Sequence, residues 1–420
     1  MSHWLLLAAK SAWNRRLTLG LTVLAVALSV VLLLGVERVR SDAREGFTQS
    51  VSGTDLIVGA RTSAVQLMLY TVFRIGEATN NMRWDAYQEL ARHPLIAWTI
   101  PLSLGDSHRG FPVLGTTPGY FEHFRYGDSR PLAFAAGKPF AELFDAVLGA
   151  QVAEALGYRM GDRIVLSHGI GGIGLPEHAD KPFVVSGILQ RTGTPVDRTV
   201  HVSLAAIQAI HLDWQGGAPV PGFSIPAQYV RKFDLTPKEI TAALIGLHSR
   251  AAVFKMQRYI DDYKGEPLMA VLPGVALDEL WRVVGVAENT LLAVSGMVVL
   301  VGLTGLVAVV LAGLNERRRE IAVLRAVGAS PRGIFLLLTT EGLLVTALGC
   351  VLGILLLLAL TVAAAPLAQS RYGVALHPRV ISLAELRLLA LVIAVGVLAS
   401  LIPGYRAYRL SLADGLAPRL

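Results

Sequence analysis

The sequence has 420 residues, of which 53% are hydrophobic and only 16% are charged. This composition, with apolar runs at widely separated places, excludes an ordinary water-soluble chain and indicates a polytopic membrane protein. The formal net charge is +7, but Lys and Arg cluster beside the apolar runs, so the charge predicts topology and no nucleic-acid partner. The single cysteine, Cys350, excludes an intrachain disulfide.

The first apolar run, from Leu17 to Val36, has roughly the 20 residues that cross a bilayer as a helix. It is too long for a cleaved signal peptide and no small-residue cleavage pattern follows it, so we expect a retained anchor. Residues 1–16 combine Trp and Leu with Lys10, which predicts an amphipathic cytoplasmic segment lying on membrane lipids. A fraying terminus explains the same pattern equally well.

Three further apolar runs predict the remaining spans, at 289–314, 334–365 and 386–403. Basic residues precede the first span, separate the second from the third, and follow the fourth within 404–420. All of these basic clusters lie on one face, which the positive-inside rule assigns to the cytoplasm. We therefore expect both termini in the cytoplasm and a short outer loop at 366–385.

Residues 37–288 are predicted to form a large domain on the outer side, inserted between the first and second spans. Strand and helix patterns alternate within it, so we expect an α+β fold. The predicted strands are Asp55–Val58, Arg163–Leu166, Phe183–Val185 and Thr199–Val202. The predicted helices are Trp84–Ala91, Phe140–Leu156 and one beginning at Thr236. A Gly/Pro-rich stretch at 216–226 predicts a boundary with a second subdomain around 204–270.

A charged segment at 315–333 separates the second and third spans. Three apolar residues recur in it at helical spacing, Ile321, Leu324 and Val327. Gly328 favours a left-handed helix end, and Ser330 followed by Pro331 favours the start of the next helix. A loop that only fixed topology would need the basic residues but not this amphipathic helix. We interpret the segment as a docking surface for a cytoplasmic partner; a simple positive-inside loop is the alternative.

Residues 319–330, REIAVLRAVGAS, resemble the signature of ABC transporter permeases of the MacB, FtsX and LolC/LolE superfamily. Residues 52–60 (SGTDLIVGA) and 147–164 are similar to the periplasmic core domain of MacB-like permeases, and residues 403–409 are similar to the family's closing segment. The resemblance extends over essentially the whole chain. Leu412 departs from it, because the family's tail usually has a proline there.

The resemblance implies a permease of the bacterial inner (cytoplasmic) membrane that works as a dimer with a second permease copy or paralogue. It further implies a cytoplasmic ABC ATPase subunit docked on the segment between the second and third spans. The implied coupling residues are Glu316, Arg317, Arg318, Glu320, Ile321, Leu324, Arg325, Val327, Gly328 and Ser330. A periplasmic adaptor or lipoprotein is a further candidate partner.

The sequence contains no G-x-x-x-x-G-K-[S/T] motif, and Gly137-Lys138 is followed by Pro139. We therefore expect a non-catalytic membrane subunit without a cofactor of its own, with ATP bound by the partner subunit. The expected function is that of the permease in an export or mechanotransmission complex, which converts ATP-driven motion of the ATPase into movement of the periplasmic domain. The alternative is an FtsX-like, non-transporting regulator of a periplasmic enzyme.

Three residues of the third span, Glu341, Gly349 and Gly353, are of special interest. Glu341 lies about two helical turns into the span, where a carboxylate either faces a partner or the bundle interior or snorkels to the interface. Gly349 and Gly353 have the G-x-x-x-G spacing that permits close helix packing, within the chain or across a dimer.

The outer domain also contains a loop rich in glycine and histidine. His168, Glu177 and His178 match no standard spacing for metal ligands, so we expect no metal site. The glycines at 169–174 satisfy G-x-G-x-x-G, but Pro176 follows where a helix should begin. A flexible hairpin is the better interpretation of this loop.

Overall fold

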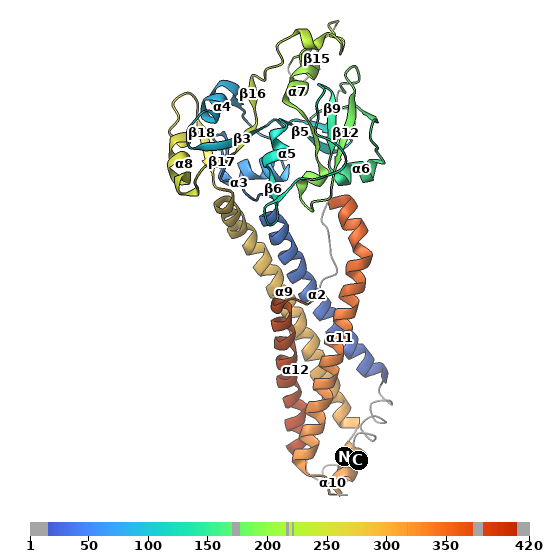
Figure 1. Ribbon diagram of the computed structural model, residues 1–420. Helices are drawn as coiled ribbons and strands as arrows, with labels where there is room; N and C mark the ends of the chain where they lie inside the picture. The colour runs from blue at the N-terminus through green and yellow to red at the C-terminus, as the bar shows by residue number, and fades with distance from the viewer. Residues whose placement is uncertain are drawn as a thin grey trace. The chain divides into compact units, whose positions relative to one another are not determined.

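The computed structural model describes residues 16–169, 177–215, 218–220, 222–316, 318–326, 328–372 and 381–409 (Figure 1). The chain divides into two compact units. The first, here called the helix bundle, comprises Met1–Asp42, Gly285–Gln369 and Leu376–Leu420, and the second, the inserted domain, comprises Ala43–Val284 with Ser370–Ala375. The amphipathic segment expected at 1–16 lies, except for Arg16, outside the described residues.

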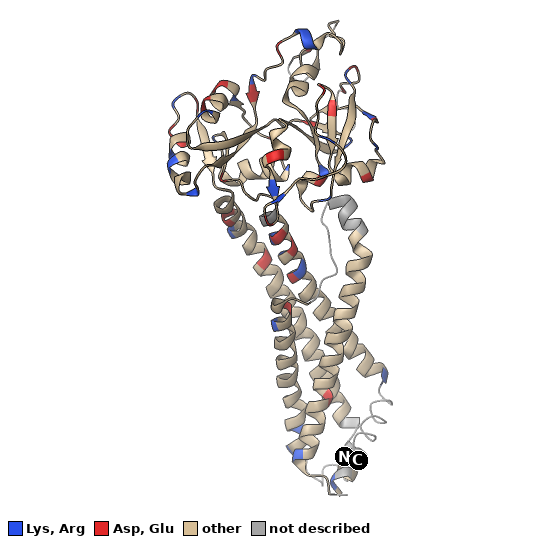
Figure 2. Ribbon diagram, in the orientation of Figure 1, with Lys and Arg blue, Asp and Glu red and all other residues tan. Residues whose placement is uncertain are grey.

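Among the described residues, four long helices build the helix bundle: α2 (Arg16–Gln49), α9 (Pro273–Glu316), α11 (Pro331–Tyr372) and α12 (Leu383–Arg409). Each is long and apolar enough to cross a membrane, and Figure 2 shows their central stretches almost free of charged residues. The expected fold class, four transmembrane helices with an α+β domain between the first and second, is confirmed. The helices run beyond the predicted apolar spans because polar residues at their ends still favour helix.

Contacts between α2 and α9 show that these two helices are antiparallel. The hydroxyl of Ser29 on α2 donates to the carbonyl of Val298 on α9 at 3.3 Å. Later in α2, Arg40 forms an ion pair of 3.1 Å with Glu288, which comes earlier in α9. The order of the contacts therefore reverses along the two helices.

The glycines of α11 and α12 define the remaining directions. A Cβ at Gly349 would lie 2.7 Å from Cβ of Val26, and one at Gly353 would lie 2.9 Å from Cβ of Val30, so α11 runs parallel to α2. By contrast, Gly342 faces Ser400, whereas Gly396 faces Thr346, so α11 and α12 are antiparallel. The starts of α2 and α11 consequently share one end of the helix bundle with the ends of α9 and α12.

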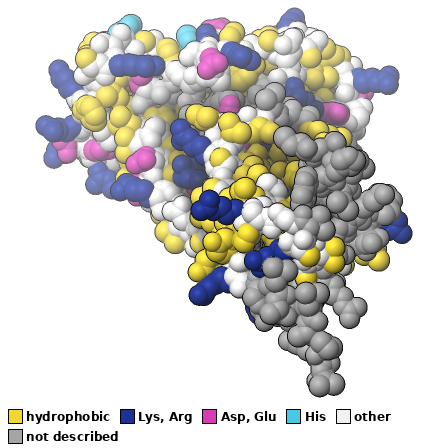
Figure 3. All heavy atoms as spheres, turned by 90° about the horizontal axis from the view of Figure 1, so that it is seen from below, with side chains coloured by type: hydrophobic (Ala, Val, Ile, Leu, Met, Phe, Trp, Pro, Cys, Tyr) yellow, Lys and Arg dark blue, Asp and Glu magenta, His cyan; other side chains and the backbone are white. Residues whose placement is uncertain are grey.

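This shared end is basic. It carries Arg16, Arg325, Arg332, Arg406 and Arg409. Figure 3 looks at the molecule from below and shows Lys and Arg side chains beside hydrophobic surface on that face. The described residues of the three basic clusters that the sequence places on one side of the membrane therefore lie at one end of the helix bundle.

The opposite end of the helix bundle carries charges of both signs. Nε of Arg38 on α2 donates to Oε1 of Glu385 on α12 at 2.7 Å. The side chain of Glu385 is fully buried, and that of Arg38 is 9% exposed. Arg40 pairs with both Glu37 and Glu288. Removing these charges from water is costly unless they are paired, so the ion pairs hold the ends of α2, α9 and α12 together.

The inserted domain contains a four-stranded antiparallel sheet in the order β18-β1-β17-β3. Its strands are β1 (Leu56–Ala60), β3 (Ile96–Leu102), β17 (Ala242–Leu247) and β18 (Leu268–Val271). Successive side chains of β1 point to opposite faces: Leu56 and Val58 enter one hydrophobic core, and Ile57 enters another. Helices α4 (Trp84–Ala91) and α8 (Val253–Asp261) supply side chains to the first of these cores.

A second, mixed sheet has the order β10-β12-β9-β13-β5-β4-β11, with β8 also paired to β12. Its strands are β4 (Asp106–His108), β5 (Phe111–Thr116), β8 (Phe134–Gly137), β9 (Asp145–Leu148), β10 (Arg163–Ile164), β11 (Ser167–His168), β12 (Phe183–Leu189) and β13 (Val200–Ser203). Helices α6 (Ala150–Leu156) and α7 (Leu204–Ile210) pack on it.

Shorter elements complete the inserted domain. They are α3 (Ala64–Met68), η1 (Leu69–Phe73), β2 (Met82–Arg83), α5 (Gly119–His123), β6 (Arg125–Tyr126), β7 (Arg130–Pro131), η2 (Pro195–Arg198), β14 (Trp214–Gln215), β15 (Ala218–Pro219), η3 (Val230–Lys232), β16 (Glu239–Ile240) and η4 (Arg250–Ala252). The predicted helix Trp84–Ala91 coincides with α4 and is confirmed.

One predicted helix of the inserted domain, Phe140–Leu156, is right only in its last seven residues, and the one expected from Thr236 is wrong. Within Phe140–Leu156 the structure has strand β9, then Gly149 as an extended N-cap, and only then helix α6. β9 lies between β12 and β13 in the sheet, and its alternate side chains enter two different hydrophobic cores, so its apolar run is buried on both faces. Such a run has no periodicity that separates strand from helix. No helix begins at Thr236; instead β16 pairs with β2, so tertiary pairing overrides the local proline signal.

Candidate functional site

The segment between α9 and α11 forms a separate short helix, α10 (Arg318–Ala326). Gly328 has a φ of +102°, in the left-handed region, and its N–H donates to the carbonyl of Arg325 at 3.1 Å. The hydroxyl of Ser330 accepts from the N–H of Gly333 at 3.1 Å, which caps the start of α11 at Pro331. The predicted pattern of helix, break and helix is therefore confirmed, and α10 is held at the basic end of the helix bundle.

The side chains of α10 point in different directions. Ile321 is 7% exposed and packs in the hydrophobic core of the helix bundle, whereas Val323 is 59% exposed. Arg325 is half-buried, and Ser330 is exposed. Arg317 and Val327 lie outside the described residues, as do the side chains of Glu316, Arg318, Glu320 and Leu324. Of the apolar residues in the predicted coupling surface, Ile321 thus anchors α10 to the bundle.

Glu341 and the two predicted packing glycines lie on α11. Glu341 is half-buried. Gly349 and Gly353 face α2 of the same chain: a Cβ on Gly353 would lie 2.9 Å from the carbonyl oxygen of Ala27. Because backbone atoms line this contact, only glycine permits α2 and α11 to approach so closely.

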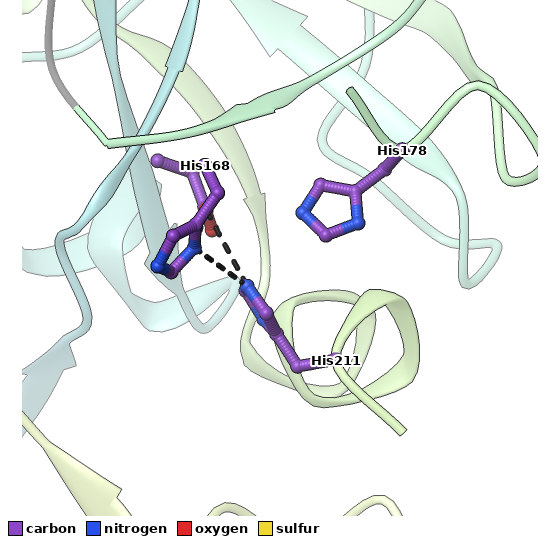
Figure 4. Close-up of side chains that lie close together, drawn as sticks. His168, His178 and His211 are labelled. Atoms are coloured by element: carbon purple, nitrogen blue, oxygen red, sulfur yellow. Dashed lines mark hydrogen bonds and ion pairs between the residues drawn. The ribbon is translucent and has the colours of Figure 1, made fainter. Parts of the chain in front are cut away.

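The inserted domain contains a group of polar side chains that we call the His/Asp cluster, defined as Asp106, His168, His178 and His211 (Figure 4). One potential ligand atom from each residue lies within 4.8 Å of the others. Nδ1 of His168 lies 3.2 Å from Oδ1 of Asp106 and 3.1 Å from Nε2 of His211. Nε2 of His211 and Oδ1 of Asp106 are separated by 3.5 Å.

Different elements position these side chains. Asp106 on β4 and His168 on β11 are direct cross-strand partners, so their side chains leave the same face of the sheet. His211 is the C-cap residue of α7. His178 precedes β12, and its N–H donates to the carbonyl of Leu166 at 2.9 Å. Glu177 is exposed and does not belong to the cluster.

Burial and hydrogen bonding set the charges within the His/Asp cluster. Burial would raise the pKa of Asp106, but hydrogen bonds with His168 and His211 outweigh it and lower the pKa to about 2. Burial lowers the pKa of His178 to about 4, so its ring is neutral at neutral pH. Burial opposes protonation of His211 as well, yet its hydrogen bond with Asp106 raises its pKa. The cluster therefore combines one carboxylate with a neutral buried imidazole.

Sequence reasoning considered His168 and His178 but missed Asp106 and His211. Asp106 precedes His168 by 62 residues and His211 follows it by 43, so no short motif contains the set. Only the pairing of β4 with β11 and the position of the end of α7 bring them together. Among the described residues, this is the one group of three or more His, Asp, Glu or Cys side chains whose potential ligand atoms all lie within 4.8 Å of one another.

Two family models match the chain. A MacB-like periplasmic core domain matches residues 19–231, and an FtsX-like permease C-terminal domain matches residues 292–412. A comparison with curated protein sequences finds no significant match.

Solved structures also match about half of the chain. One is the periplasmic region of MacB from Actinobacillus actinomycetemcomitans, with 11% identity, a TM-score of 0.34, and coverage of 55% of this chain and 94% of that one. Another is the extracellular domain of the noncanonic ABC-type transporter YknZ from Gram-positive bacteria, with 10% identity, a TM-score of 0.29, and coverage of 52% and 99%.

Proposed function

Because the chain belongs to the superfamily of ABC transporter permeases that join a MacB-like periplasmic core domain to an FtsX-like permease domain, we propose that it is the permease subunit of an export or mechanotransmission complex. Permeases of this family work with a cytoplasmic ABC ATPase. In the proposed complex, ATP binding and hydrolysis by that separate subunit drive movement of the inserted domain, which lies in the periplasm. The ATPase shifts the permease between states only if it binds them with different free energies.

The observation that carries the proposal is the placement of α10. The helix is bounded by the left-handed Gly328 on one side and is held to the helix bundle by Ile321. On the same helix, Val323 is 59% exposed although it is apolar. A partner seated on Val323 would therefore act on a short helix that lies between α9 and α11 in the sequence. A basic loop that only fixed topology would not need an anchored helix.

Val323→Asp is expected to uncouple the ATPase without preventing membrane insertion. The new charge would enter the apolar contact with the partner, and loss of such an anchor costs about 2 kcal/mol, or roughly 30-fold in affinity. Glu320→Lys, which reverses a charge among arginines, should chiefly change pairing specificity. The measurements are copurification of the cognate ATPase and stimulation of its ATP hydrolysis by the permease in nanodiscs.

Val323→Thr is the matched control, because threonine keeps the shape of valine without a formal charge and should still recruit the ATPase. The amount of membrane-inserted permease is measured for all variants. If Val323→Asp inserts normally and still recruits and stimulates the ATPase like the parent chain, α10 is not the coupling element and the proposed mechanism is wrong.

Reporter fusions test the proposed orientation. We expect a periplasm-specific reporter to be active when fused after the exposed Asp128, and a cytoplasm-specific reporter to be active after Ala326. The reason is that the basic residues of three separate chain segments gather at one end of the helix bundle. Activity of the opposite reporter at either position would exclude the proposed orientation, with both termini in the cytoplasm.

A further inference from the structure

His178 is a buried imidazole whose polar atoms are unused. Its side chain has no exposed surface, and neither ring nitrogen has a hydrogen-bond partner among the described residues. A buried polar group without a partner costs about 1–3 kcal/mol, and an ion or water that satisfies it is the usual explanation. By contrast, both ring nitrogens of the nearby His108 are satisfied, by the carbonyl of Val165 and the hydroxyl of Tyr158. His178, which has no partner at either ring nitrogen, belongs to the group with Asp106, His168 and His211.

Lone pairs converge in the His/Asp cluster. Nδ1 of His211 lies 2.8 Å from the carbonyl oxygen of Ile207. A carbonyl can only accept, so this nitrogen carries the proton and Nε2 presents a lone pair to the cluster when the ring is neutral. An ionised Asp106 is also only an acceptor. His168 can donate a single hydrogen bond from Nδ1. The Asp106 carboxylate and Nε2 of His211 both need a donor, so at least one of them is left without one.

We propose that the His/Asp cluster is a binding site for a divalent transition-metal ion of the Zn²⁺ class, held by Asp106, His168, His178 and His211. Imidazole and carboxylate are ligands that Zn²⁺ accepts in tetrahedral sites. Ligand atoms about 2.0–2.1 Å from such an ion lie about 3.3–3.4 Å from one another. The separations of 3.1, 3.2 and 3.5 Å among Asp106, His168 and His211 agree with this spacing.

The surroundings of the cluster suit a metal site that exchanges its ion with solvent. The carbonyl of Ile207 orients His211 by binding its other ring nitrogen, which is the common outer contact of a metal-bound histidine. The ring of Trp214 lies 4.0 Å from that of His178, centroid to centroid, and packs against it. The side chains of His168 and His211 remain 37% and 25% exposed, which leaves a route for the ion.

The experiment uses the full-length chain in detergent, first stripped of metal with a chelator. Zn²⁺ is titrated in competition with a chromophoric chelator, and bound metal is counted by mass spectrometry after gel filtration. We expect one tightly bound ion per chain. Co²⁺ in its place should give the intense visible absorption of a tetrahedral complex, which an octahedral surface complex lacks.

His168→Ala and His178→Ala should each lower the affinity for Zn²⁺ by at least about 10–100-fold, since even outer-sphere changes have effects of that size. His248→Ala removes an exposed histidine outside the cluster and should leave the affinity unchanged. If the buried His178→Ala does not fold, the more exposed His168→Ala decides the result.

The proposal is overturned if the parent chain binds Zn²⁺ no more tightly than His168→Ala, or if His248→Ala weakens binding as much as the cluster variants do. None of these measurements involves an ATPase. A negative result would therefore leave the proposed coupling function untouched, and failure of ATPase coupling would leave the metal site untouched.

Discussion

Gly149→Ala is expected to destabilise the inserted domain by about 3 kcal/mol or more, at the upper end of overpacking effects. A Cβ at Gly149 would lie 2.2 Å from the carbonyl oxygen of Val196 and 2.4 Å from that of Asp197. These are backbone atoms, and they are not free to move, because the Asp197 carboxylate accepts hydrogen bonds from the N–H groups of Thr192 and Gly193. The measurement is thermal unfolding and limited proteolysis of the full-length chain in detergent.

Gly157→Ala, at the other end of α6, is the matched control. Its φ of +70° disfavours alanine, but a Cβ there would meet no atom within 4 Å. It should cost only about 1 kcal/mol. Equal stabilities of the two variants would show that the contact at Gly149 relaxes freely, and that the close approach of β9–α6 to η2 does not require glycine.

Glu385→Gln is expected to destabilise the helix bundle by about 3–5 kcal/mol, the usual cost of leaving a buried charge uncompensated. The substitution leaves Arg38 without the carboxylate that its Nε contacts at 2.7 Å. It also isolates the effect of charge. Glu385 accepts from the N–H of Ser382 while the hydroxyl of Ser382 accepts from the N–H of Glu385, and glutamine can fill the same place in such a capping box.

The double variant Arg38→Met with Glu385→Gln removes both charges and should recover most of the lost stability, since apolar replacement of a buried pair is often neutral. Thermal unfolding in detergent measures the stability of the parent chain, of Glu385→Gln and of the double variant. If the double variant is no more stable than Glu385→Gln alone, the pair does not act through its charges.

The sequence predicted well those features that depend on short stretches of chain. Span positions follow from apolar length, and the break between α10 and α11 follows from Gly328, Ser330 and Pro331, whose conformations are set locally. By contrast, the helix predicted over strand β9 is wrong, because a short, continuous apolar run has no periodicity that distinguishes a strand from a helix. In both cases the outcome depended on whether the deciding contacts were local.

The His/Asp cluster could not be predicted for the same physical reason. The pair Asp106 and His168 is created by the register of β4 on β11, and register is decided by pairing across the sheet. His211 is the C-cap residue of α7, and nothing in the sequence around it indicates a metal ligand. The one available signal was the pair His168 and His178 flanking a glycine-rich loop, which by itself matches no known ligand spacing.

The ion pair between Arg38 and Glu385 also has a consequence for the lipids that the protein tolerates. It lies just beyond the apolar run of α2 that ends at Val36, and that run of roughly 20 residues is about 30 Å long as a helix. The neighbouring Arg40 and Glu37 are partly exposed, and in a thicker bilayer these charges would be drawn into hydrocarbon unless the lipids thinned around them, at a cost that grows with each ångström of mismatch. The charges that follow Val36 thus favour a membrane no thicker than the apolar run of α2.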